Sequence, residues 1–79
     1  MKEFIEYVAK HLVDDPDSVV IEEKMIEDNK KHILSLKVKP EDIGKVIGKQ
    51  GKSAQAMRIL LTAVAAREGK RATLEILDK

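Results

Sequence analysis

The chain has 79 residues, of which 43% are hydrophobic and 37% are charged, with a formal net charge of +1 at pH 7. A chain of this length folds as one domain whose core is too small to enclose a large active site. Its apolar runs are far shorter than a membrane span, and the absence of cysteine excludes disulfides and thiolate metal sites. Acidic residues interrupt the N-terminus, where a secretory signal needs an apolar run, so we expect a cytoplasmic protein.

The two parts of the chain differ in charge. Residues 1–28 contain nine acidic and three basic side chains, whereas residues 29–79 contain five acidic and twelve basic ones. This asymmetry favours a surface in the second part that faces a polyanion. A dipolar protein surface without any ligand explains the same charge count equally well.

The first predicted element is a helix over residues 2–13, because its apolar residues recur every three or four positions. Pro16, in an acidic segment, ends this helix. A strand from Ser18 to Ile26 follows, and the polar segment 27–30 supplies a turn. The next run alternates cleanly, which predicts a second strand and a hairpin. Its inward residues are expected to be His32, Leu34, Leu36 and Val38.

The second half of the chain predicts two helices and a final strand. Pro40 suits the first position of a short helix over residues 40–47, which ends at Gly48. A longer helix runs from about Gly51 to Glu68, and residues 71–77 alternate as a strand. The order α-β-β-α-α-β predicts an α+β fold, in which a three-stranded sheet carries its helices on one face. Residues 1–79 then form a single domain.

The segment Gly48-Lys49-Gln50-Gly51 joins the two helices and is too short for anything but a tight bend. Glycine at both ends permits positive φ angles and removes the Cβ atoms that would keep a ligand away. The N–H groups of the bend and of the following helix then form a site for phosphate. Lys45 and Lys52 add positive charge on either side.

A bare GxxG pattern is more often a simple helix–helix turn, but the basic context and the element order favour a functional loop here. A Walker phosphate-binding loop is excluded, because it needs a glycine at position 46, where this chain has Val46.

The run Val46-Ile47-Gly48-Lys49-Gln50-Gly51-Lys52 resembles the signature of KH domains, and the element order resembles their type II topology. The resemblance covers nearly the whole chain, whose length and opening helix are similar to the KhpA family of small bacterial proteins with a single KH domain. The chain departs from the pattern at Ala54, where many KH domains have a larger aliphatic residue.

This resemblance implies binding of single-stranded RNA, by an RNA chaperone or a post-transcriptional regulator. The loop would hold phosphates through its amides and Lys49, and the bases would lie in an apolar groove between the helix pair and the second strand. Ile47 would form a wall of that groove. With no aromatic residue nearby, binding would be weak and salt-dependent. The expected RNA-binding residues are Gly48, Lys49, Gln50, Gly51, Lys45, Ile47, Lys52, Ser53, Lys37 and Lys39.

The longer helix carries two apolar strips. The arc expected to face the core consists of Ala54, Met57, Leu60, Leu61, Val64 and Ala65. The second strip consists of Ala56, Ile59, Ala63 and Ala66. A helix that is apolar on two sides often buries the second side elsewhere, so a symmetric dimer through Ala56, Ile59 and Ala63 is our hypothesis. The resemblance implies self-pairing or pairing with a larger, KhpB-like protein that also contains a KH domain.

Other function classes receive less support. A winged helix-turn-helix that binds duplex DNA through Lys52, Gln55 and Arg58 stays an alternative, as does a protein-interaction module acting through the last helix. His11 and His32 lie on separate elements, and no nucleophile–base or metal-ligand spacing stands out. We therefore expect no enzyme activity, no cofactor and no metal.

Overall fold

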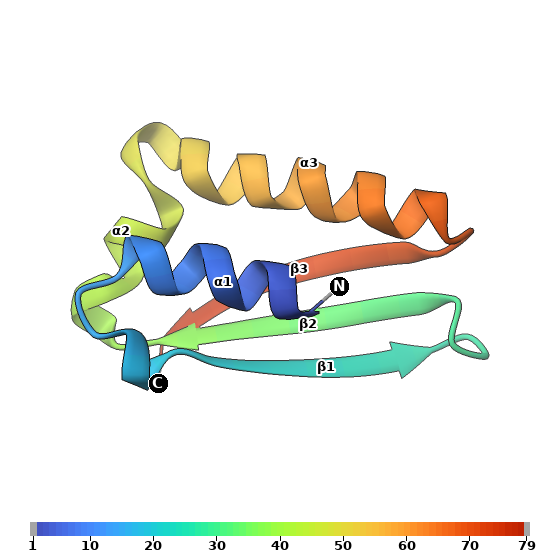
Figure 1. Cartoon of the computed structure of the whole chain (residues 1–79), viewed down its shortest axis with the longest axis horizontal. Helices are drawn as coiled ribbons and strands as arrows, with labels where there is room; N and C mark the ends of the chain where they lie inside the picture. Colours follow the sequence, from blue (N-terminus) through green and yellow to red (C-terminus); the bar gives the residue numbers. More distant parts are fainter. Residues whose placement is uncertain (1, 79) are drawn as a thin grey trace.

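The computed structural model describes residues 2–78 and has the predicted element order (Figure 1). Short 3₁₀ turns lie before β1, before α2 and before α3, and are labelled η1 (Pro16–Ser18), η2 (Pro40–Asp42) and η3 (Lys49–Gly51). The helices are α1 (Lys2–Leu12), α2 (Ile43–Ile47) and α3 (Lys52–Arg67), and the strands are β1 (Val20–Ile26), β2 (Lys31–Val38) and β3 (Arg71–Asp78). The predicted α+β class is confirmed.

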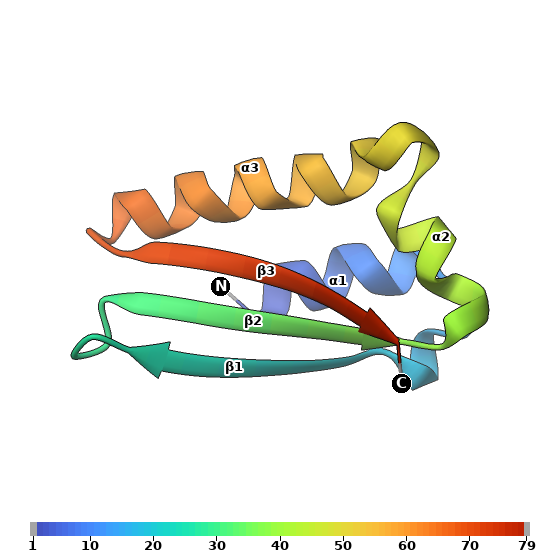
Figure 2. The same ribbon diagram turned by 180° about the vertical axis from the view of Figure 1, so that it is seen from behind.

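The sheet has the strand order β1-β2-β3, so β2 is its central strand. β1 and β2 form the predicted antiparallel hairpin, whereas β2 and β3 run parallel, with Leu34 opposite Leu74. Parallel neighbours need a crossover connection, and α2 and α3 provide it. The helices pack on one face of the sheet, and the bend between α2 and α3 lies at the end of the molecule opposite the β1–β2 turn (Figures 1 and 2).

The core lies between this face of the sheet and the helices. β2 alternates between buried and half-buried residues along its whole length, as predicted for a strand with one face on the core. His32 belongs to the buried face, and its Nδ1 lies 2.7 Å from Oε2 of Glu23. No helix within residues 2–78 is long and apolar enough to cross a lipid bilayer. The buried apolar cluster consists of Ile5, Ala9, Val13, Val19, Ile21, Leu34, Leu36, Val38, Val46, Met57, Leu61 and Leu74.

α3 buries a narrower stripe than its sequence predicts. Met57 and Leu61 are almost fully buried, but Leu60 is 51% exposed and Val64 is 36% exposed. The prediction that Leu60 and Val64 face the core is therefore wrong. The reason is geometric, because α3 packs chiefly on β3 and on α2. A helix that rests on few neighbours buries one row of side chains and leaves the adjacent row open.

Truncation of the two adjacent leucines tests this assignment. Leu61→Ala is expected to lower the free energy of unfolding by about 2–5 kcal/mol, because it leaves a cavity in the core. Leu60→Ala is expected to lower it by less than about 1 kcal/mol, because half of that side chain is already in water. Urea unfolding followed by circular dichroism at low protein concentration measures both. Equal losses at the two positions would contradict the orientation of α3.

Candidate functional site

The bend between α2 and α3 is built from residues with positive φ angles. Gly48 has φ 79° and ψ 173°, Gln50 has φ 58°, and Gly51 has φ 73°. The N–H of Gly51 donates to the carbonyl oxygen of Gly48 at 3.1 Å, and the N–H of Lys52 donates to that of Lys49. These two bonds close a single 3₁₀ turn that redirects the chain from α2 into α3.

The two glycines of the bend have different surroundings. A Cβ atom on Gly48 would lie 2.4 Å from Oγ of Ser53 and 2.9 Å from its backbone nitrogen, so only glycine fits there. A Cβ atom on Gly51 would have no atom within 4 Å and would point into open space. Gly48 thus lets the backbone fold against the start of α3. Gly51 instead leaves the outer surface of the bend open to a ligand.

Positive charge gathers on this open surface. No side-chain hydrogen bond caps α3 at Gly51, and the N–H groups of Gly51 and Lys52 donate within the bend itself. Lys49, Gln50 and Lys52 are exposed around the start of α3. Among residues 2–78 neither lysine forms an ion pair. An anion placed here would meet the positive end of the helix dipole and two ammonium groups that no carboxylate engages.

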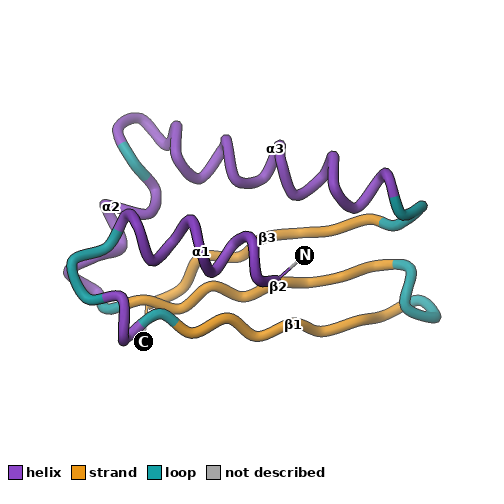
Figure 3. Tube along the Cα trace, in the orientation of Figure 1, coloured by secondary structure: helices purple, strands orange, loops and turns teal. Residues whose placement is uncertain are grey.

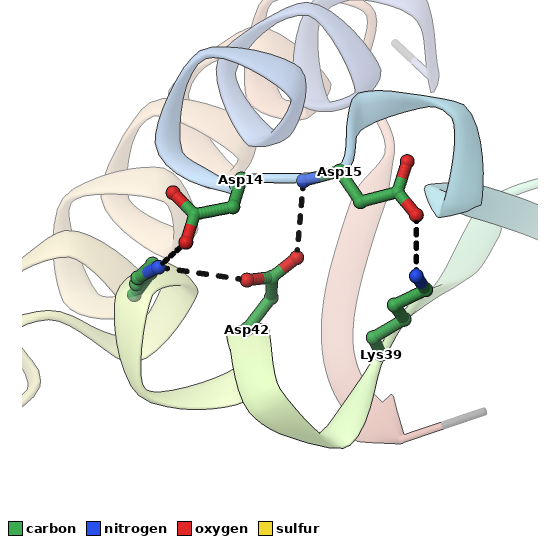
Figure 4. A network of polar contacts seen from close by, with 5 residues as sticks. Asp14, Asp15, Lys39 and Asp42 are labelled. Atoms are coloured by element: carbon green, nitrogen blue, oxygen red, sulfur yellow. Dashed lines mark hydrogen bonds and ion pairs between the residues drawn. The ribbon is translucent and has the colours of Figure 1, made fainter.

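Three other predicted cations are engaged by carboxylates instead. Lys37 Nζ lies 2.6 Å from Oε1 of Glu22, on the face of the sheet away from the helices. Lys39 Nζ lies 2.6 Å from Oδ2 of Asp15, and its hydrogen bond to that carboxylate raises the pKa of Lys39 and lowers the pKa of Asp15. Figure 4 shows this pair below the connection from α1 to β1. The structure does not bring Lys37 or Lys39 to the bend.

Lys45 is held in a polar network at the base of α2. It forms ion pairs with Asp14 and with Oδ1 of Asp42, the latter at 3.8 Å, and the Asp14 carboxylate raises its pKa. Asp42 is only 3% exposed, and its Oδ2 accepts a hydrogen bond from the N–H of Asp15 at 3.3 Å (Figure 4). The network therefore ties α2, and with it the bend, to the end of α1.

The structure places a groove against β3 rather than against the second strand, and no residue of the bend lines it. The second strand is the centre of the sheet, and β3 packs directly under α3. A groove of about 160 Å³ lies between α3 and β3. Ile47 is 38% exposed at the end of α2, and Ser53 is half-buried against Gly48. The groove is lined by Arg58, Leu61, Thr62, Ala72, Thr73 and Leu74, none of which is among the expected RNA-binding residues.

Within residues 2–78, no three His, Cys, Asp or Glu side chains lie close enough together to hold a metal ion.

Comparison with known proteins matches this arrangement to a family. The family described as the KH domain of KhpA and KhpB matches residues 2–76. The chain belongs to this KH-domain family. The RNA-binding protein KhpA of Clostridium perfringens is 49% identical over 77 residues, which are 98% of this chain and 100% of that protein. KhpA of Caldanaerobacter subterraneus is 51% identical with the same coverage, and KhpA of Aquifex aeolicus is 47% identical over 99% of this chain and 96% of that protein.

Solved structures of the protein Era share the fold of this KH domain. Era from Aquifex aeolicus bound to GDP and aluminium fluoride matches with a TM-score of 0.58 and 19% identity, over 98% of this chain and 29% of that one. Era in complex with a nucleotide analogue and part of 16S ribosomal RNA matches with a TM-score of 0.53 and 22% identity, over 99% of this chain and 29% of that one.

Alanine substitution separates the roles of the two glycines in the KH domain's bend. Gly48→Ala is expected to cost about 2–4 kcal/mol of stability, because it adds a collision with Ser53 to a strained backbone. Gly51→Ala is expected to cost about 1–2 kcal/mol, because its Cβ meets only the cost of the left-handed conformation. Thermal unfolding measures the difference. A Gly51→Ala variant less stable than Gly48→Ala would contradict the packing of the bend.

Proposed function

We propose that the chain binds single-stranded RNA through the Gly48–Gly51 bend and the groove between α3 and β3, as an RNA chaperone or post-transcriptional regulator. The observation that carries this proposal is the open surface at Gly51, where Lys49 and Lys52 lie at the start of α3 without carboxylate partners. Such a surface suits a phosphate group. The KhpA relatives are named RNA-binding proteins, which supports RNA as the polymer that is bound. A KH loop of this form clamps a backbone segment of about four nucleotides.

The bound strand has a natural path along α3. Lys52, Gln55, Arg58 and Thr62 recur every three or four residues, so they line one side of the helix from the bend to the groove. Over these ten residues α3 advances about 15 Å, at 1.5 Å per residue. Phosphates would lie at the bend, and the bases would enter the groove over the side chains of Leu61 and Leu74.

The ion pairs at Lys37, Lys39 and Lys45 limit the electrostatic part of binding. Lys45 could reach a phosphate only by leaving Asp14 and Asp42. Lys49 and Lys52 are the cations left for phosphates at the bend. Neutralising about two phosphates of a single strand gives a slope of about −1.4 for log K against log salt concentration. The affinity of one domain should accordingly be modest.

A double substitution tests the phosphate site. Lys49→Asp with Gln50→Asp places two carboxylates at the bend, so affinity for single-stranded RNA at low salt should fall at least about tenfold. The matched control is Lys30→Asp with Asn29→Asp, which makes the same chemical change in the β1–β2 turn at the opposite end of the molecule (Figure 3). Fluorescence anisotropy with labelled RNA, and with duplex DNA at equal salt, measures both.

Unchanged affinity in the bend variant, or an equal loss in the control, would rule out the bend as the contact. Stronger binding of duplex DNA than of single-stranded RNA would favour the helix-turn-helix alternative.

We further propose that α3 joins two domains, either in a homodimer or in a mixed pair with a KhpB-like protein. Ala56, Ile59 and Ala63 are all exposed, and Ile59 is 62% exposed. The open side chains of Leu60 and Val64 widen this strip beyond its predicted extent. Contiguous exposed apolar residues on one helix favour burial against a partner. A second RNA site in the pair would raise the avidity without any new contact.

Charge placed in the strip tests the homodimer. Ile59→Asp should leave the protein folded and convert a dimer into a monomer, because an unpaired carboxylate would be buried at the interface. Tyr7→Asp is the control, since Tyr7 is a large apolar residue of α1 that is 66% exposed and outside the strip. Sedimentation equilibrium reads out the mass. A wild-type monomer, or an Ile59→Asp variant with unchanged mass, would contradict the homodimer.

A further inference from the structure

The groove between α3 and β3 has an apolar floor and a polar lip. Leu61 is 1% exposed and Leu74 is 4% exposed, so their side chains form a dry floor. Arg58, Thr62 and Thr73 line the same groove and are exposed. A nucleobase that packs on Leu61 and Leu74 would therefore present its polar edge to this lip of Arg58, Thr62 and Thr73.

The lip has a defined set of donors and acceptors. The hydroxyl of Thr62 donates to the backbone carbonyl of Arg58 at 2.8 Å, so its proton is used and its lone pairs are free to accept. The guanidinium of Arg58 has no carboxylate partner among residues 2–78. Arginine is a planar fork of donors with no acceptor. The lip thus offers two parallel donors and a neighbouring acceptor.

We propose that Arg58 determines base preference in this groove, selecting guanine and cytosine over adenine and uracil. This inference rests on the proposed RNA binding. Guanine has adjacent acceptors at O6 and N7, and cytosine has adjacent acceptors at N3 and O2, so each can take both donors of the fork. In adenine the amino group lies between the ring acceptors N1 and N7, and in uracil the N3–H lies between the two carbonyl groups. Neither of these bases can accept a bidentate contact.

The position of Arg58 favours contact with a base over contact with a phosphate. Arg58 follows Lys52 by six positions, so its Cα atom lies about 9 Å further along the helix axis than the Cα atom of Lys52 at the bend. The groove next to it is floored by leucine side chains. A phosphate there would lose its hydration without gaining backbone donors, whereas an aromatic base would lose little.

Substitution by lysine separates these two roles, because lysine keeps the charge and removes the fork. The probes are short oligouridines in which one central nucleotide is guanosine, adenosine, cytidine or the unchanged uridine. Wild type should bind the guanosine probe about five- to tenfold more tightly than the adenosine probe, and the cytidine probe similarly more tightly than the uridine one. Arg58→Lys should bind the uridine probe within about twofold of wild type and lose both preferences.

A probe with 7-deazaguanosine, which lacks N7, tests the edge that is read. If wild type binds it as weakly as adenosine, Arg58 contacts the O6 and N7 edge. Preferences that persist in Arg58→Lys overturn the proposal, and so does an Arg58→Met variant that weakens binding to all four probes equally, because that result makes Arg58 a phosphate contact. These results would leave RNA binding itself intact. Failure of wild type to bind any probe would instead overturn the proposed function.

Discussion

The parallel pairing of β2 with β3 is the constraint on which the rest of the molecule depends. Two neighbouring strands that run the same way cannot be joined by a tight turn, so the chain must cross the sheet between them. α2 and α3 are this crossover, and the bend at Gly48–Gly51 is the point where it reverses. The same pairing makes β3 an edge strand directly under α3. The bend and the groove therefore both follow from the parallel pairing of β2 with β3.

The polar contacts of Asp42 and Lys45 at the base of α2 stabilise the fold. Asp42 is buried and contacts both Lys45 and the backbone of Asp15, so it joins two segments that are distant in the sequence. A buried carboxylate is tolerated only with such partners. Lys39 and Lys45, two of the basic residues between β2 and α3, are thus already paired with carboxylates of the protein. The proposed binding then rests on Lys49 and Lys52, which lie beyond α2.

The sequence predicted the elements of this fold better than their arrangement. Alternation in β2 and the glycines at the bend are local signals, and both led to correct elements. The position of β3 beside α3 depends on strand order, which no local pattern encodes, so the groove was expected against β2. Leu60 and Val64 were assigned to the core, because periodicity shows that a face is apolar but not whether a neighbour covers it. Arg58 and Thr62 are missing from the expected RNA-binding residues because their place beside the groove follows from the position of β3.

The contact between Gly48 and Ser53 gives the two glycines of the bend different structural roles. At Gly48 the close approach of the backbone to the start of α3 leaves no room for a side chain, whereas at Gly51 only the left-handed backbone conformation favours glycine. Asparagine adopts that conformation more readily than most residues, so it can replace Gly51 at a smaller cost than it can replace Gly48. Tolerance to substitution should therefore differ between the two ends of one short motif.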